Sequence, residues 1–473
     1  MKKTLSILFA LLLLLAPVLC VPAEEITLPV HVQGSIFGGS GKDSIPLEVR
    51  FDPAWMSEGD GTAYNEDLAA FCAILSEDIY YRPKDLDRGT PNRVLIDGAD
   101  PDAYDQTVLL STLGWEDVRY IESVKAGTYE KDQNDSVTLV LGYCNDRDLN
   151  DSFVIVVRGC FSAGEWYSIF DPGSEAEGYE KLTGSHPEWT DTRLLKGIGI
   201  AANRAQTFID AYIGAHDDPA RENRVLVTGH SRGGAVAEVL GARFEEDLSV
   251  TCRTYTFNAT PVTTDADAPA YGTVFNIFDS ADFFSDCLPF GNETFYRYGR
   301  TLSLPVAGNR ELLNTIAAIK GADDYRCLSE DAAETYRTLF ARLFPNRASL
   351  YAPRVAEYSF ESKAEAEAAR ENFLTLISAE TGFGLDAFCF VSDITADTAG
   401  KTVFYMTYSR AGELECIGRT LAYGQSASDA VHMLFAQDED ICTVADFIMA
   451  NAADITGGHR LLNSYALIGY VHA

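Results

Sequence analysis

Ser231 stands on an expected turn between a short apolar strand and a helix. The chain around it reads Val-Leu-Val-Thr-Gly-His-Ser-Arg-Gly-Gly-Ala, with the strand expected over 224–228 and the helix running on through Phe244. Small residues two positions before and after the serine let strand and helix approach closely. The tight turn then presents the serine hydroxyl at the carboxyl end of the sheet. This pattern predicts a nucleophilic serine.

A serine nucleophile needs a general base, and three histidines follow Ser231 in the chain. His472 is next to last, where only a chain end could hold it. His432 lies in an apolar run, which is typical of a histidine on a helix face or in a core. His459 follows two glycines on an expected loop. We predict His459 as the base, with His432 as the main alternative.

The base needs an acidic residue to orient it, and three candidates lie in one short segment. Asp279, Asp282 and Asp286 follow a strand expected over 274–278. The carboxyl end of that strand would place them near Ser231. Residue types alone do not separate the three, because each could also cap a turn or a helix.

Two backbone N–H groups are needed to bind the negative oxygen that forms during acyl transfer. One is the amide of Arg232, which follows the nucleophile at the start of the helix. The second is expected from a loop after an earlier strand. The apolar run 153–157, followed by Arg158-Gly159-Cys160, fits this role through the Cys160 amide. A plain turn at the strand end is the alternative.

The elements that must position these residues alternate between strands and helices from about residue 110 to 290. Strands are expected over 136–143, 153–157, 224–228, 255–257 and 274–278, and helices over 66–81, 190–213 and 231–244. This alternation predicts an α/β fold whose mostly parallel sheet carries helices on both faces.

The pattern changes beyond residue 300. Helices are expected over 309–345, 362–379 and 438–453, and a β-hairpin over 403–408 and 415–421, around Gly412. We predict a core over 24–300, an inserted α+β cap or lid over 301–440, and a return to the core over 441–473 that carries His459.

Composition favours an exported globular protein. Residues 1–23 combine Lys2 and Lys3 with a short apolar stretch and small residues, as in a cleavable signal peptide; an uncleaved anchor is the alternative. No later stretch of the sequence is long and apolar enough to be a transmembrane helix. The net charge of −33 would repel nucleic acid and anionic membranes. We therefore expect a secreted protein, with association with the cell surface as the alternative, and at most transient contact with a lipid interface.

Ten cysteines occur in the 473 residues without metal-binding spacing. They predict neither a zinc site nor a disulfide framework. Several, such as Cys72, sit in apolar runs and are expected to be core thiols.

Taken together, these motifs resemble the class 3 lipases, the fungal-lipase-like branch of the α/β-hydrolases. The matching segments are Val156–Cys160 with Glu165-Trp166, Leu194–Ile198, Gly229–Ala235, and Asn276–Asp282 with Leu288-Pro289. A histidine followed by a tyrosine near the end, here His459 and Tyr465, also fits. The resemblance covers roughly residues 65–300 and the last 30.

The resemblance favours Asp282 as the acid and implies hydrolysis of lipid carboxylic esters, acylglycerols or phospholipids, without metal or cofactor. The sequence departs from the family at Cys160, where the family has Thr or Ser, and at Leu195, where it has His. The 177 residues from Asp282 to His459 are also an unusually long separation. Rival interpretations are an esterase or peptidase of another substrate class, an acyltransferase, or a binding protein without activity.

Overall fold

We describe a computed structural model of the chain. It describes residues 25–33, 44–81, 93–100, 104–123, 136–145, 150–160, 165, 168–169, 193–218, 220–247, 249–280, 282–286, 294–304, 310–320, 326–346, 349–378 and 384–468. The predicted signal segment 1–23, Trp166, Leu288-Pro289 and His472 lie outside the described residues. Among the described helices, none is long and apolar enough to cross a membrane.

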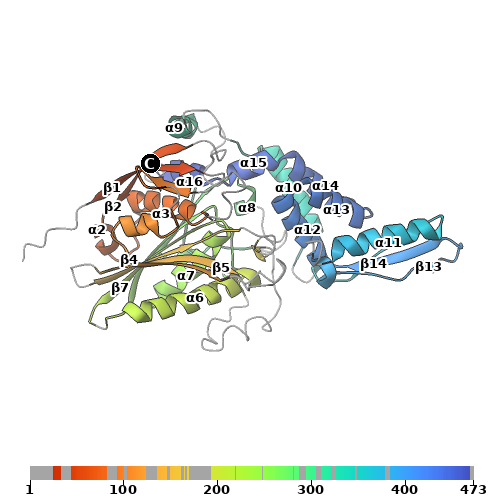
Figure 1. The fold of residues 1–473 in the computed structure, drawn as a ribbon, viewed down its shortest axis with the longest axis horizontal. Helices are drawn as coiled ribbons and strands as arrows, with labels where there is room; N and C mark the ends of the chain where they lie inside the picture. The colour runs from red at the N-terminus through yellow and green to blue at the C-terminus, as the bar shows by residue number, and fades with distance from the viewer. Residues whose placement is uncertain are drawn as a thin grey trace, which may run out of the picture.

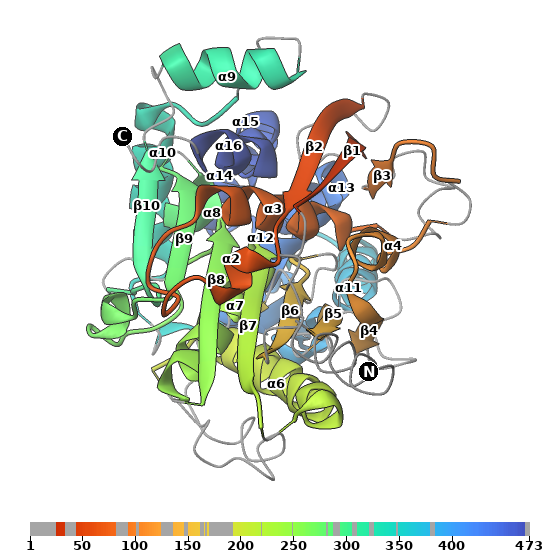
Figure 2. The ribbon, with the colours of Figure 1, turned by 90° about the vertical axis from the view of Figure 1, so that its left-hand side faces the viewer.

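A seven-stranded sheet in the order β10-β9-β8-β7-β6-β5-β4 forms the centre of the fold (Figures 1 and 2). Its strands are β4 (Glu116–Ser123), β5 (Val137–Asn145), β6 (Asn150–Val157), β7 (Glu222–His230), β8 (Val250–Phe257), β9 (Val274–Asp279) and β10 (Arg300–Leu304). Strands β6 to β10 pair in parallel, whereas β5 is antiparallel to both β6 and β4. The predicted mostly parallel sheet is confirmed.

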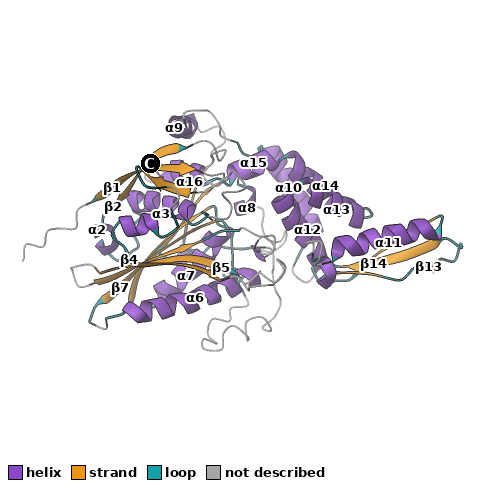
Figure 3. Cartoon of the chain, viewed as in Figure 1, coloured by secondary structure: helices purple, strands orange, loops and turns teal. Residues whose placement is uncertain are grey.

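Both faces of this sheet are buried, because alternate residues of each strand face different cores. In β6, Phe153 and Ile155 belong to one hydrophobic cluster, while Val154 and Val156 belong to the other. The helices on one face are α6 (Lys196–His216) and α7 (Arg232–Glu246), and on the other α3 (Glu66–Asp78) and α16 (Leu461–Leu467) (Figure 3). The sequence reads as apolar runs here for this reason.

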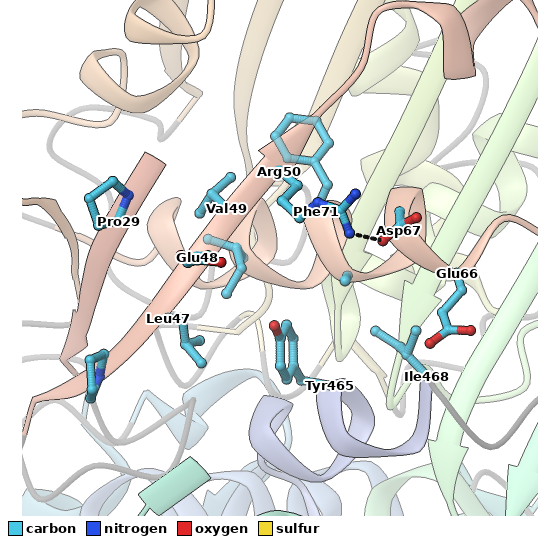
Figure 4. Close-up of a pocket in the computed structure, with 13 residues that line it drawn as sticks. Pro29, Leu47, Glu48, Val49, Arg50, Glu66, Asp67, Phe71, Tyr465 and Ile468 are labelled. Carbon is cyan, nitrogen blue, oxygen red and sulfur yellow. Dashed lines mark hydrogen bonds and ion pairs between the residues drawn. The ribbon is translucent and has the colours of Figure 1, made fainter. Parts of the chain in front are cut away.

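The N-terminal part adds a small antiparallel sheet in the order β2-β1-β3 beside α3. Its elements and the neighbouring short helices are β1 (Ile26–Gln33), β2 (Ile45–Phe51), α2 (Ala54–Ser57), β3 (Arg93–Ile96) and α4 (Val108–Thr112). A cavity of about 650 Å³ lies between β1, β2, α3 and α16, where Arg50 pairs with Asp67 at 3.1 Å (Figure 4). None of the predicted site residues lines this cavity.

Beyond β9 the chain first adds to the core and then leaves it. Strand β10 extends the large sheet, and α9 contacts α16 and β2. Two short helices flank β9, namely η4 (Ala268–Ala270) before it and α8 (Phe283–Asp286) after it. The remaining elements are α9 (Arg310–Lys320), α10 (Glu330–Leu343), β11 (Arg354–Phe360), α11 (Lys363–Ile377), η7 (Leu385–Ala387), β12 (Cys389–Val391), β13 (Thr395–Ala396), β14 (Thr402–Tyr408), α12 (Arg410–Tyr423), α13 (Gln425–Leu434), α14 (Glu439–Ala450) and α15 (Ala452–Gly458).

The elements from α10 to α14 pack on one another beside the core (Figure 1). Strand β14 pairs with β11, β12 and β13, and α11 lies on one face of this sheet. The hairpin predicted around Gly412 is wrong. Gly412 lies in the first turn of α12 and packs against Phe388, and helical spacing buries Leu414 and Ile417.

The chain returns to the core at the place where it left. The backbones of Arg326 and Gly457 touch, since a Cβ on Gly457 would lie 2.4 Å from the Arg326 carbonyl oxygen. About 130 residues are therefore inserted between two points that are neighbours in space. The second of these points, Gly457, lies two residues before His459. An insertion of this kind leaves the core geometry intact.

Asp78, at the end of α3, offers a test of this core. The Tyr104 hydroxyl donates to Asp78 at 2.5 Å, and burial raises the pKa of Asp78 to about 8. In the unfolded chain the carboxyl ionises near pH ~4. The free energy of unfolding should therefore fall as pH rises from about 5 to 8, by on the order of 3 kcal/mol more in wild type than in Asp78→Asn.

Chemical unfolding at several pH values measures this difference. Asp429→Asn, at an exposed position of α13, is the matched control and should keep the pH dependence of wild type. A gap between wild type and Asp78→Asn that stays constant with pH would contradict a neutral buried carboxyl.

Candidate active site

Ser231 occupies the turn between β7 and α7 in a strained backbone conformation, with φ of 57° and ψ of −127°. Residues other than glycine rarely adopt positive φ, so surrounding contacts must hold the turn. The Ser231 N–H donates to the Phe257 carbonyl at 2.8 Å, and its own carbonyl accepts from Ala235 at 2.9 Å. Strand β8 and the first turn of α7 thus fix the serine from both sides.

The two flanking glycines are required by close backbone contacts. A Cβ on Gly229 would lie 2.5 Å from the carbonyl carbon of Gly233. A Cβ on Gly233 would lie 2.2 Å from the carbonyl oxygen of Val157. No larger residue fits at either position without moving the backbone. The prediction that these small residues let strand and helix approach closely is confirmed. Strand β6 takes part in the same contact through Val157.

Asp282 is the acid that reaches a histidine. Its Oδ2 lies 2.7 Å from Nδ1 of His459, and its side chain is fully buried. The carboxylate also accepts from the Phe284 N–H at 3.0 Å and from the Ser285 hydroxyl at 2.6 Å. These donors fix its orientation. Asp279 closes β9, and its carbonyl accepts from the Asp282 N–H at 2.9 Å.

His459 follows α15 directly and is 9% exposed. Its ring centroid lies 4.6 Å from that of Phe284 and 4.8 Å from that of His230. Because Nδ1 faces a carboxylate, Nδ1 carries the proton. Among the described residues, none hydrogen-bonds Nε2, so this nitrogen can accept a proton.

The competing histidine is placed elsewhere. His432 lies on the exposed side of α13 and pairs with Asp446 at 2.8 Å, on the neighbouring helix α14. It is a surface residue of the inserted elements, as its helix-face interpretation suggested.

His230, immediately before Ser231, holds the backbone of His459. Its Nε2 lies 2.9 Å from the His459 carbonyl oxygen, which can only accept, so Nε2 carries the proton. Its Nδ1 then accepts from the Tyr80 hydroxyl at 3.0 Å. Burial lowers the pKa of His230 well below its ordinary value, and the neighbouring His459 lowers it further. The sequence motifs did not single out His230 or Tyr80 for a role at the site, although the position of His230 beside Ser231 was a usable signal.

Further hydrogen bonds hold the segment after His459. The Asn258 side chain donates to the Arg460 carbonyl at 3.4 Å and accepts from the Ser464 hydroxyl at 3.0 Å. Asn463 donates to the Gly457 carbonyl at 3.0 Å. Asn258 directly follows β8 and has a φ of 50°. The returning chain is thus tied to the carboxyl end of the sheet at several points.

The two expected oxyanion donors lie on segments that touch. Val157 pairs with Gly229 in the sheet, and a Cβ on Gly159 would lie 2.7 Å from the His230 carbonyl oxygen. The chain that leads to Cys160 therefore runs along the turn that carries Ser231 and Arg232. Burial raises the pKa of the Cys160 thiol well above its ordinary value, so the thiol stays protonated. The oxyanion role of the two amides remains a prediction.

Replacing Tyr80 by Phe tests the support of the base. The change removes the donor to His230 Nδ1 and leaves a buried acceptor unpaired, which costs about 1–3 kcal/mol. We expect Ser231 to react with a fluorophosphonate probe about tenfold more slowly, because His459 loses a firm support.

Stopped-flow or gel-based labelling rates measure this effect. Tyr212→Phe removes a part-buried hydroxyl that donates to the Asp117 carbonyl, and it should leave the labelling rate near that of wild type. Equal rates for Tyr80→Phe and wild type would contradict the role given to Tyr80.

Part of the chain matches a known protein family. Residues 154–287 match the family model described as Lipase (class 3). No curated protein matches the chain. The matched segment runs from β6 to α8 and includes Ser231 and Asp282, whereas His459 lies outside it.

Several solved lipase structures are similar at low identity. The Lip2 lipase from Yarrowia lipolytica is 15% identical, covering 46% of this chain and 71% of its own, with a TM-score of 0.30. The Rhizomucor miehei triacylglyceride lipase is 17% identical, covering 48% and 76%, with a TM-score of 0.29. The lipase from Rhizopus microsporus var. chinensis is 15% identical, covering 50% and 71%, with a TM-score of 0.29.

The family match includes the strained serine turn, and this turn lies on a mostly parallel sheet with helices on both faces. Residues 154–287 are thus similar to the class 3 lipases of the α/β-hydrolases, and the protein is a serine ester hydrolase.

Proposed function

We propose that the protein cleaves carboxylic esters of lipids, acylglycerols or phospholipids, through an acyl-enzyme formed on Ser231. The observation that carries the proposal is the contact of 2.7 Å between Asp282 and His459 beside the strained turn of Ser231. Residues separated by 177 positions meet there, and the pair leaves Nε2 of the imidazole without a described partner.

The reaction follows from these roles. Nε2 of His459 takes the hydroxyl proton of Ser231 as the oxygen attacks the ester carbonyl carbon. The proton then passes to the leaving alcohol oxygen as its bond to the carbonyl carbon breaks. A water molecule repeats the sequence on the acyl-enzyme, which releases the carboxylic acid and restores Ser231.

Asp282 and the backbone amides stabilise the charges that develop. The buried carboxylate holds His459 in the tautomer with the proton on Nδ1, and it attracts the imidazolium that forms during attack. The amides of Cys160 and Arg232 bind the oxygen of the tetrahedral intermediate. Cys160 contributes through its backbone, so the change from the hydroxyl residue of the family leaves this donor in place.

We further propose that the elements from α10 to α14 form a cap over the site. Phe283 and Phe284 link the two parts. The ring centroid of Phe283 lies 4.0 Å from that of Tyr336 in α10, with the rings tilted by 50°, and Phe284 contacts the His459 ring. Movement of the cap would therefore shift the contacts of the His459 ring. The cap would restrict or gate the entry of long acyl chains.

Labelling by a fluorophosphonate probe, followed by peptide mapping, tests the nucleophile. We expect modification of Ser231 alone, and loss of ester hydrolysis by at least about 10³-fold in Ser231→Ala, His459→Ala and Asp282→Asn. His432→Ala is the matched control and should keep the activity of wild type. Labelling at another residue would disprove the assignment.

The choice of substrate in the same assay separates the rival functions. Cleavage of acylglycerol or phospholipid esters in preference to peptide amides supports the proposal. Preference for amides would indicate a peptidase, and transfer of the acyl group to an added alcohol in preference to water would indicate an acyltransferase.

Removal of the cap tests its role. Because Arg326 and Gly457 touch, a short glycine-serine linker can replace residues 329–450 without stretching the core. We expect activity on a short soluble ester to change less than about threefold, while the preference for long acyl chains changes by tenfold or more. Probe labelling of Ser231 shows that the core has folded. Equal effects on short and long esters would refute the cap.

A further inference from the structure

The side chain of Arg232 is among the largest in the described structure that are fully buried, with an exposed fraction of 0%. Its Nε–H donates to the Ser168 hydroxyl at 2.6 Å, and an Nη2–H donates to the Ser136 carbonyl at 2.9 Å. A guanidinium loses its hydration when it is buried, so such a position is costly unless firm contacts replace the water. Arg232 thus makes specific contacts through its side chain, in addition to the backbone amide expected to bind the oxyanion.

Both contacts of Arg232 lead to Glu165, which is also buried. The Ser168 hydroxyl donates to the Glu165 carbonyl at 2.7 Å, and the Ser136 hydroxyl donates to the Glu165 carboxylate at 2.9 Å. The same carboxylate oxygen lies 3.6 Å from Nη2 of Arg158. One buried carboxylate therefore connects two buried arginines.

These two arginines belong to the two segments expected to bind the oxyanion. Arg158 precedes Cys160 by two residues, and its N–H donates to the Thr138 carbonyl at 3.0 Å. Arg232 supplies the other amide. The segments also touch directly, because a Cβ on Gly233 would lie 2.6 Å from the Arg158 carbonyl carbon. The network therefore ties the strand end, Glu165, Ser168 and the first residue of α7 into one unit.

We propose that Arg232 acts through its side chain as a positioning residue of the oxyanion hole, together with Glu165. The network holds the Cys160 and Arg232 amides at a fixed separation. This inference rests on the proposed function, since it concerns the intermediate of ester cleavage at Ser231.

Arg232→Leu tests the inference, because leucine keeps the apolar bulk and the backbone amide but removes the charge and both hydrogen bonds. Ser168→Ala is a milder variant that removes the hydroxyl that accepts from the Arg232 Nε–H and donates to the Glu165 carbonyl. Arg419→Leu is the matched control: Arg419 is as deeply buried, pairs with Glu415 at 2.8 Å in α12, and lies outside the proposed catalytic machinery.

Three quantities are measured for each full-length variant on a short soluble ester. They are kcat per active site titrated to the end point with a fluorophosphonate, KM, and the affinity of a boronic acid that forms a tetrahedral anionic adduct with the serine. For Arg232→Leu we expect kcat to fall about 10²-fold with KM within about threefold, and boronate affinity to fall by a similar factor. For Ser168→Ala we expect a fall of about fivefold in kcat and affinity. Arg419→Leu should keep kcat per titrated site.

Several results would overturn the inference. If kcat per titrated site stays within twofold of wild type in both variants, the inference is overturned. It is also overturned if the loss appears in KM alone, or if Arg419→Leu lowers kcat as much as Arg232→Leu does. If Arg232→Leu yields no titratable sites, Ser168→Ala decides by the same criteria. A wild-type protein that neither cleaves the ester nor takes the probe overturns the proposed function together with this inference.

Discussion

The close approach of strand β7 to helix α7 is the constraint on which the rest of the structure depends. It forces Ser231 to a positive φ, a strain of about 1–3 kcal/mol that persists only where neighbours over-determine the backbone. Gly229 and Gly233 allow the approach, and the hydrogen bond from Ser231 to Phe257 maintains it. The same contact presses the end of β6 against the turn. The proposed nucleophile and the two expected oxyanion amides are thus brought together by one backbone packing event.

The proposed base reaches this turn by a long route that costs the core little. The chain leaves at Arg326 and returns at Gly457, and these residues touch, so the inserted elements can vary in size without displacing His459. Hydrogen bonds from Asn258 and His230 then tie the returning segment to the sheet. The inserted elements are linked to the site through Phe283 and Phe284, which gives a physical route by which a cap could act on the base.

Buried polar groups surround the site in two different states of charge. His230 is kept neutral by burial, which suits a residue that must hold one tautomer between Tyr80 and the His459 backbone. Arg232 is a charged residue, and its burial is offset by hydrogen bonds to Ser168 and Ser136, which connect it to the buried Glu165. One group serves as a fixed hydrogen-bonding spacer, and the other ties the first residue of α7 to its neighbours.

The sequence by itself determined the strained turn, because the strand, the glycines and the helix are contiguous and the pattern is local. It also determined the parallel sheet, whose buried strands read as apolar runs. Residue types alone left three acids equivalent, and the choice of Asp282 depended on the family resemblance. Folding brought Asp282 to His459, a contact that joins segments 177 residues apart. The sequence predicted a hairpin where α12 forms, because a glycine alone does not reveal whether it turns the chain or packs within a helix against Phe388. The role of the Arg232 side chain was invisible for the same reason, since its partners come from three distant segments that only folding assembles.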